Sequence, residues 1–333
     1  MTSSLKLLSW NARSIVKTNK DMLVNYCLMN GVNIFCIQET HLKPHINPTF
    51  KGFNILRKDR INADKGGILV GIKKNIHFVP IRTQYLDKFD KIEVQGCRVF
   101  LSKNMTVNIF NVYNPQGDSP QISDVLSTIV TNIPPRDMFI IVGDFNSHSN
   151  IWCNCGTTNR SGNHIEELLM NSDNICLLTP KNLPTRLNSN TGSYTTIDLM
   201  FSSPALLNRS NISCCEDSSL YSDHNPILLE LDKNYHVPNP DGNTDGNRLS
   251  MSQLRCMDWN VSRNILNRSN VNVQLERTTN TDENIVIFQN LLIKAGKGAT
   301  IYRTYELYIE MQRSNARLKK TIVRAKKIHG LNS

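Results

Sequence analysis

The chain has 333 residues, 39% of them hydrophobic, and its 38 Lys and Arg residues exceed its 28 Asp and Glu residues to give a formal net charge of +10. This length suits one large domain plus a smaller piece, and no apolar run approaches the roughly 20 residues of a membrane-spanning helix, so we expect no membrane partner. The first twenty residues are polar and charged throughout, and the nine cysteines form no C-x-x-C pair, which favours an unsecreted protein of the nucleus and cytoplasm. The positive charge favours a polyanionic partner.

Six apolar segments each adjoin polar residues that are chemically competent. In chain order, the predicted strands are Leu5–Ser9, Val32–Ile37, Met105–Val112, Met138–Val142, Ser193–Ile197 and Ile227–Leu231. Apolar runs bounded by Gly, Asn or Asp are typical of buried strands next to turns. Because sheet proteins usually build their sites from the ends of several strands, the joint presence of these segments predicts one site.

Other segments predict a mixed architecture. Helices are expected at Lys20–Met29, Gln121–Thr131 and His164–Asn171. Gly66-Gly67 predicts a tight turn into a strand at Ile68–Ile72. An antiparallel meander is suggested by the short gaps between Phe89–Val94, Val99–Leu101 and Met105–Val112. Pattern alone therefore leaves the fold class open between α/β and α+β.

The polar residues at the strand ends are rich in hard oxygen donors. They are Asn11, Glu39, Tyr113, Asp144, Asn146, Asp198, Asp223 and His224. The chain has no Ser nucleophile elbow, Gly-rich phosphate loop or zinc-spaced Cys/His cluster, which disfavours acyl transfer, nucleotide-driven phosphoryl transfer and zinc hydrolysis. Carboxylate and amide oxygens suit Mg²⁺, and a water-activating Asp beside a charged His would complete a site for phosphodiester hydrolysis.

Each of these residues also has a purely structural interpretation. Asn11 could cap a turn, Glu39 could be a solvated loop acid, and the pair Asp223-His224 could form a turn before a strand. Asp198 is harder to explain in this way, because a buried Asp needs a partner. The order and joint presence of all six segments favour the functional interpretation of the set.

The ordered motifs WNAR, QETHL, NVYNP, GDFN, TTIDLMF and SDHNP closely resemble those of the endonuclease/exonuclease/phosphatase superfamily. More narrowly, WNARSI, QETHLK and GDFNSHSNIW are similar to the apurinic-type endonuclease domain of non-LTR retrotransposons of the Jockey and I types. The resemblance covers Leu5 to Leu231. It implies a four-layer α/β sandwich, with two facing mixed β-sheets flanked by helices.

The resemblance also implies a metal site and a base. Glu39 would be the principal Mg²⁺ ligand, with Mn²⁺ as a substitute metal, and Asn11 and Asp223 would be secondary ligands. Asp144 would take the proton from the attacking water, and Asn146 would orient that water or the phosphate.

Three further roles follow from the same resemblance. Asp198 would hold the tautomer of His224, whose protonated ring would stabilise charge on the phosphorane, and Tyr113 would donate to a phosphate oxygen. The implied product is a nick with a 3′-hydroxyl and a 5′-phosphate. The choice between Asp144 and the His224–Asp198 pair as general base stays open.

Basic and hydroxyl residues near the motifs are candidate contacts to the DNA backbone, because such side chains make most phosphate contacts. The candidates are Arg13, Lys17, Arg186, Thr195 and Thr196, with Arg317, Lys319 and Lys320 farther along the chain. Ordinary solvated surface residues are the alternative interpretation. His148 is open between a substrate contact and a loop side chain.

Composition divides the chain into a catalytic domain at 1–233, a linker rich in Asn, Pro and Gly at 234–250, and a helical, basic connector at 251–333. Between Arg313 and Lys327 there are seven basic residues and no acid. Such a segment is typical of RNA or DNA binding or of a nuclear localisation signal, and equally of a solvated helix or a frayed end. In similar retrotransposon proteins such a connector leads into a reverse transcriptase. No polymerase motif follows here, so we expect a fragment, a truncated copy or a free-standing nuclease, with the polymerase lost or acting in trans.

The sequence thus predicts an enzyme that uses Mg²⁺ to nick DNA and prime reverse transcription of a mobile element, with element RNA as a further candidate partner. One alternative is an abasic-site repair endonuclease or another phosphoesterase of the superfamily. The other is a catalytically dead relic that only binds nucleic acid.

Overall fold

The computed structural model describes residues 4–232, apart from residues 17, 61–64, 103–104, 116, 118, 135–136, 155, 173 and 217–219. Lys17, the predicted linker 234–250 and the predicted connector 251–333, which contains Arg317, Lys319 and Lys320, lie outside the described residues. Within the described part of the chain, no helix is long and apolar enough to span a membrane.

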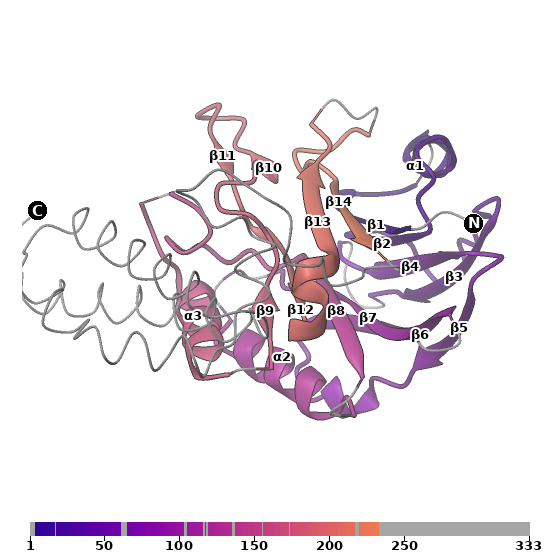
Figure 1. The fold of residues 1–333 in the computed structure, drawn as a ribbon. Coiled ribbons are helices and arrows are strands. Elements are labelled where there is room, and N and C mark those ends of the chain that lie inside the picture. Colours follow the sequence, from indigo (N-terminus) through magenta and orange to yellow (C-terminus); the bar gives the residue numbers. More distant parts are fainter. Residues whose placement is uncertain are drawn as a thin grey trace, which may run out of the picture. The chain divides into compact units, whose positions relative to one another are not determined.

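Two six-stranded sheets form the centre of the described part of the chain (Figure 1). The first, sheet A, has the strand order β13 (Ser210–Cys214), β14 (Ile227–Asp232), β1 (Ser4–Asn11), β2 (Ile34–Gln38), β4 (Ile68–Lys73) and β3 (Phe53–Lys58). The second, sheet B, has the order β5 (His77–Ile81), β6 (Glu93–Ser102), β7 (Met105–Tyr113), β8 (Met138–Asp144), β12 (Asp198–Ser202) and β9 (Cys176–Leu177). A separate ribbon joins β10 (Arg186–Leu187) to β11 (Tyr194–Thr195).

Both sheets are mixed. In sheet A, β1 and β2 are parallel, and in sheet B, β7 and β8 are parallel, whereas the other described strand pairs are antiparallel. Parallel neighbours end at the same edge of a sheet, so the polar residues that follow β1 and β2 come together, as do those that follow β7 and β8.

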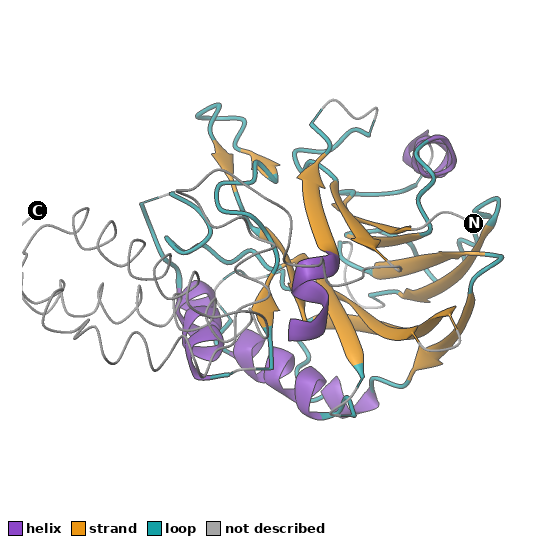
Figure 2. Ribbon diagram, viewed as in Figure 1, coloured by secondary structure: helices purple, strands orange, loops and turns teal. Residues whose placement is uncertain are grey.

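Helices cover the outer faces of the two sheets (Figure 2). Helix α1 (Thr18–Met29) packs on sheet A, and helices α2 (Gln121–Thr131) and α3 (Arg160–Asn171) pack on sheet B. Short 3₁₀ helices occur at Gln84–Leu86 (η1) and Pro204–Arg209 (η2). A third core, which includes Leu7, Ile34, Val107 and Ile140, fills the space between the sheets. The predicted four-layer α/β sandwich is confirmed for the described residues.

Most predicted elements are present, and three differ from the prediction. The predicted strand Ser193–Ile197 is wrong in its bounds: β11 ends at Thr195, and the buried strand β12 begins only at Asp198. Helix α3 begins four residues before His164, at Arg160, because the Asn159 side chain accepts a hydrogen bond from Gly162 N and caps the helix. Most of the segment Phe89–Val94 precedes β6, and Phe89 and Ile92 are buried there without joining a strand.

A polar bridge crosses the core between the sheets, close to the predicted site residues. Gln38 at the end of β2 donates through Nε2 to Asn111 Oδ1 on β7 over 2.7 Å, and Asn111 Nδ2 donates to the Ile37 and Leu69 carbonyls. Gln38 and Asn111 are both fully buried. Because a buried amide must keep its partners, this bridge ties the end of β2 to the end of β7.

Candidate active site

An open pocket of about 220 Å³ lies where the strand ends of the two sheets meet. Its walls are formed by Arg13, Glu39, Lys65, Tyr113, Pro115, Asp144, Asn146, Arg186, Asp223 and His224. The other two predicted residues, Asn11 and Asp198, are buried and hydrogen-bonded to residues of this wall. The eight residues predicted for catalysis and metal binding are therefore brought together.

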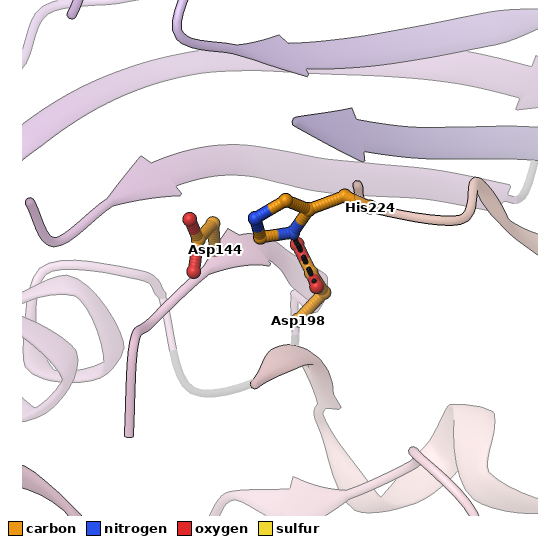
Figure 3. Close-up of side chains that lie close together, drawn as sticks. All are labelled: Asp144, Asp198 and His224. Carbon is orange, nitrogen blue, oxygen red and sulfur yellow. Dashed lines mark hydrogen bonds and ion pairs between the residues drawn. The ribbon is translucent and has the colours of Figure 1, made fainter. Parts of the chain in front are cut away.

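His224 and Asp198 form a buried pair (Figure 3). Nδ1 of His224 lies 2.9 and 3.0 Å from the two carboxylate oxygens of Asp198. The His224 backbone is fixed as well, since its carbonyl accepts from Trp10 Nε1 and its N–H donates to Ser222 Oγ. Burial alone would lower the pKa of His224, but the negative charge of Asp198, helped by Asp144, raises it to about 9. The ring is therefore charged at neutral pH, with its other nitrogen turned toward the side of Asp144 (Figure 3).

Asp144 is also buried, at the end of β8 and opposite Asp198 on β12. Its Oδ1 accepts from Asn146 N, and its Oδ2 accepts from Asn11 Nδ2 at 2.8 Å and from Asn146 Nδ2 at 3.1 Å. Asn146 can turn back in this way because its φ is 47°, a left-handed conformation that Asn adopts more readily than most residues. Burial and the nearby charge of Asp198 raise the pKa of Asp144 to about 7, against the lowering effect of His224.

Glu39 follows β2 and reaches the pocket from the side of sheet A. Its Oε1 accepts from Asn11 Nδ2 at 3.0 Å and from the Tyr113 hydroxyl at 2.9 Å, and His41 Nε2 lies 3.2 Å from its Oε2. Burial acts to raise the pKa of Glu39, but the hydrogen bonds from Asn11, Tyr113 and His41 together lower it below its ordinary value. Glu39 is therefore an ionised carboxylate facing the pocket.

One group of side chains and one single carboxylate could hold a divalent metal. Asp144, Asp198 and His224 place one potential ligand atom each within 4.8 Å of the others, but a protonated imidazole already paired with Asp198 is a poor ligand. The ionised oxygens of Glu39 match the hard donors that Mg²⁺ prefers, so the implied metal fits the Glu39 side of the pocket.

The two predicted secondary ligands are engaged elsewhere. Asn11 Oδ1 accepts from Arg13 N, and Asn11 Nδ2 donates to both Glu39 and Asp144. The amide therefore lies between the two carboxylates and bonds to each. Asp223 Oδ2 lies 3.0 Å from Arg13 Nη1 and 3.4 Å from Arg186 Nε. Partial burial acts to raise the pKa of Asp223, but the charge of His224, followed by those of Arg13 and Arg186, lowers it below its ordinary value.

The residues expected to contact DNA differ in their exposure. Arg13 and Arg186 line the pocket, with side chains that are 54% and 41% exposed. Thr195 is half-buried in β11. Thr196 is buried, and its hydroxyl donates to the Leu183 carbonyl, so it does not reach the surface. His148 is half-buried, and burial and the charge of Arg186 lower its pKa.

Three residues near the site were not among the predicted ones. Lys65 lines the pocket beside Gly66-Gly67, a turn that the sequence did predict. His41 contacts Glu39 from two residues away, within the QETHL motif. Thr185 is buried, and its hydroxyl accepts from Asp198 N at 3.2 Å. The motifs could have drawn attention to Lys65 and His41, whereas a lone Thr gives no sequence signal.

Comparisons with known proteins give one family match, over part of the chain. Residues 107–228 match a family described as endonuclease-reverse transcriptase. The comparison with curated protein sequences gives no match.

Solved structures with the same fold include three proteins of different activity. The endonuclease domain of TRAS1, a telomere-specific non-LTR retrotransposon, matches 69% of this chain and 100% of its own length with a TM-score of 0.55 and 15% identity. The AP endonuclease LMAP from Leishmania major matches over 69% of this chain and 88% of its own, with a TM-score of 0.55 and 15% identity. The 3′ phosphatase NExo from Neisseria, bound to product DNA hairpin, matches over 68% of this chain and 99% of its own, with a TM-score of 0.51 and 16% identity.

The TM-scores show that these three proteins have the same fold as this chain, and at identities of 15–16% the similarity shows the fold alone. The described part of the chain therefore has the fold of the endonuclease/exonuclease/phosphatase superfamily, and residues 107–228 match its endonuclease-reverse transcriptase family.

Proposed function

We propose that this chain is a Mg²⁺-dependent endonuclease that nicks DNA, leaves a 3′-hydroxyl and a 5′-phosphate, and so primes reverse transcription of a mobile element. The observation that carries the proposal is the meeting of Glu39, Asp144, Tyr113 and His224 in one pocket, from strand ends of both sheets. The match to an endonuclease-reverse transcriptase family supports DNA as the substrate and the link to a polymerase.

Asp144 is the better candidate for the general base. Its raised pKa, about 7, leaves it able both to accept a proton from water and to release it near neutral pH. His224 is charged in the same range, because its pKa is about 9, so it has no free lone pair on the nitrogen that faces the pocket. Asn146 donates to Asp144 and fixes its orientation toward that water.

His224 then acts as a fixed positive charge. Asp198 holds Nδ1, which leaves the Nε2–H to face a phosphate oxygen and stabilise the charge that develops on it. Arg13 and Arg186 also line the pocket, where both pair with Asp223. Their remaining N–H groups can bind flanking phosphates.

Glu39 would hold the Mg²⁺, which when bound supplies positive charge to the scissile phosphate. Tyr113 donates its only hydroxyl proton to Glu39 in this structure. Its proposed contact with a phosphate oxygen therefore requires the hydroxyl to change acceptor when substrate arrives.

The test is a nicking assay on supercoiled plasmid with the full chain, with Mg²⁺ and with chelator. His224→Ala and Glu39→Ala should form no open-circle product, whereas His77→Ala, which changes an exposed histidine on β5, should match the wild type. Product that DNA ligase reseals has the expected 3′-hydroxyl and 5′-phosphate ends. A folded wild-type chain that forms no product would support a nucleic-acid-binding relic instead.

The similarity to an AP endonuclease favours one alternative, a repair enzyme that cuts at abasic sites. Single-turnover rates on an intact duplex and on the same duplex with one abasic site separate the two functions. Comparable rates fit an endonuclease that prepares target sites. A strong preference for the abasic duplex would assign the chain to repair.

A further inference from the structure

We propose that Glu93 is a positioning residue that holds Glu39 in place by anchoring the Gly66-Gly67 turn. Glu93 does not line the active-site pocket, and the metal-related part of the inference rests on the proposed function of Glu39. The turn leads into β4 of sheet A, whereas Glu93 is the first residue of β6 in sheet B.

The Glu93 carboxylate bonds directly to the turn. Its Oε2 accepts from Gly67 N at 2.8 Å, its Oε1 lies 2.9 Å from Arg60 Nε, and the residue is only 7% exposed. A charged acceptor in so buried a place binds a backbone N–H strongly, because water cannot compete for it.

The Gly66-Gly67 turn also fixes the backbone on both sides of Thr40. Gly67 O accepts from Thr40 N and Gly66 O accepts from His41 N, both at 2.9 Å. Glu39 and His41 have φ values of 50° and 53°, a left-handed conformation that is uncommon for residues other than glycine. The two hydrogen bonds hold the segment in this conformation and so aim the Glu39 side chain at the pocket.

The geometry of the turn leaves no room for side chains. A Cβ on Gly67 would lie 2.6 Å from Thr40 Oγ1, and a Cβ on Gly66 would lie 2.6 Å from Glu93 Oε1. Both glycines also have positive φ, at 85° and 95°. The turn therefore approaches Glu93 and the Glu39 segment closely enough to connect them.

Two residues of sheet B thus hold Glu39 by different routes. Glu93 pairs directly with Tyr113 across β6 and β7, so the two side chains lie on the same face of the sheet. Tyr113 bonds to the Glu39 carboxylate, and Glu93 acts on the Glu39 backbone through the turn. Loss of Glu93 should therefore loosen the segment while the Tyr113 hydroxyl remains.

The competing explanation is that Glu93 only neutralises Arg60. Two double variants separate these roles, because both lack the ion pair: Arg60→Ala with Glu93→Gln keeps an oxygen that can accept from Gly67 N, and Arg60→Ala with Glu93→Ala has none. Asp137→Ala is the matched control, since it removes the ion pair with Arg98, which lies in the middle of the same strand β6.

Hydrogen exchange of the Thr40 and His41 amides in the metal-free full chain is the deciding measurement. We expect exchange about tenfold faster or more in the Ala double variant than in the Gln double variant, with the Asp137 control at the wild-type rate. Equal exchange in the two double variants overturns the proposal, because the turn would then not depend on the Glu93 acceptor.

Calorimetric Mg²⁺ titration without DNA tests the consequence for Glu39. The Ala double variant should bind Mg²⁺ about 10- to 100-fold more weakly than the Gln double variant, as expected when an outer partner of a metal ligand is lost. Equal affinities would contradict the positioning role even if exchange changed. A wild-type chain that binds no Mg²⁺ would instead contradict the proposed function, and the exchange result would still decide whether Glu93 anchors the segment.

Discussion

Asp198 and His224 are both almost completely buried, and the negative charge of Asp198 raises the pKa of His224. Asp198→Asn keeps the size of the side chain and a carbonyl that can accept from Nδ1, but it removes the negative charge that raises the pKa of His224. We expect that pKa to fall and kcat for plasmid nicking to drop by about 100-fold or more, while the chain stays folded.

Ring-proton NMR titration of His224 together with nicking rates would test this expectation. Asp21→Asn is a suitable control, because the Asp21 side chain is 73% exposed on α1. Wild-type turnover with an unshifted His224 pKa would exclude the pair from catalysis.

The two perturbed groups also predict how nicking depends on pH. Asp144 would work as a base in its ionised form, so the rate should rise as pH passes about 7. His224 would work in its protonated form, so the rate should fall as pH passes about 9. Single-turnover rates should give a bell-shaped profile, and Asp198→Asn should move its falling limb to lower pH. If the rate of the variant fell at the same pH as that of the wild type, the role given to His224 would be contradicted.

Residues whose chemistry is visible in a motif were the ones that the sequence could predict. Glu39, Asp144 and His224 each follow or precede an apolar run, and the pocket contains all three. Glu93 and Thr185 could not be predicted, because they act through backbone N–H groups that are distant in the sequence. Their partners become neighbours only when the chain has folded.

At the level of elements, the break between β11 and β12 explains how Asp198 is oriented. The Thr185 hydroxyl accepts from Ile197 N at 3.1 Å and Asp198 N at 3.2 Å, and the Thr185 carbonyl accepts from Asn225 N beside His224. The sequence suggested a continuous strand into Asp198, since residues 193–197 have strand-like composition. Hydrogen bonds that these two backbone N–H groups donate to one side chain replace the strand pairing there.

Thr185→Val should therefore affect both stability and catalysis. It preserves the shape of the side chain but leaves two buried N–H groups without an acceptor, which should lower the free energy of unfolding by about 2 to 4 kcal/mol. We also expect slower nicking, because the Asp198 backbone is no longer fixed. Thr185→Ser keeps the hydroxyl and loses one methyl group, so urea denaturation should show a cost of about 1 kcal/mol and nicking should persist. Equal behaviour of the two variants would argue against this role of the hydroxyl.

At the scale of the whole molecule, the site exists only because the two sheets face each other. Sheet A contributes Glu39, sheet B contributes Tyr113 and Asp144, and the buried Gln38–Asn111 bridge joins strands 73 residues apart. Strand periodicity predicted most of the strands, but it carries no information on which faces meet. The resemblance of the motifs to a known superfamily implied that the two sheets face each other, and the core between them confirms this for the described residues.

The net charge of +10 belongs to the whole chain, and its densest basic segment, Arg313–Lys327, lies outside the described residues. The sequence alone predicts that this segment contacts DNA phosphates. Replacing its seven basic residues with Gln should weaken non-specific DNA binding, and it should make the slope of log affinity against log salt shallower by about 2 units or more, because each phosphate contact contributes about 0.9. Exchanging Arg for Lys and Lys for Arg in the same segment preserves the charge, so that control should keep the wild-type slope. Fluorescence anisotropy with a labelled duplex over a range of salt concentrations measures both. An unchanged slope in the Gln variant would show that the segment makes no phosphate contacts, and the DNA affinity would then come from elsewhere in the chain.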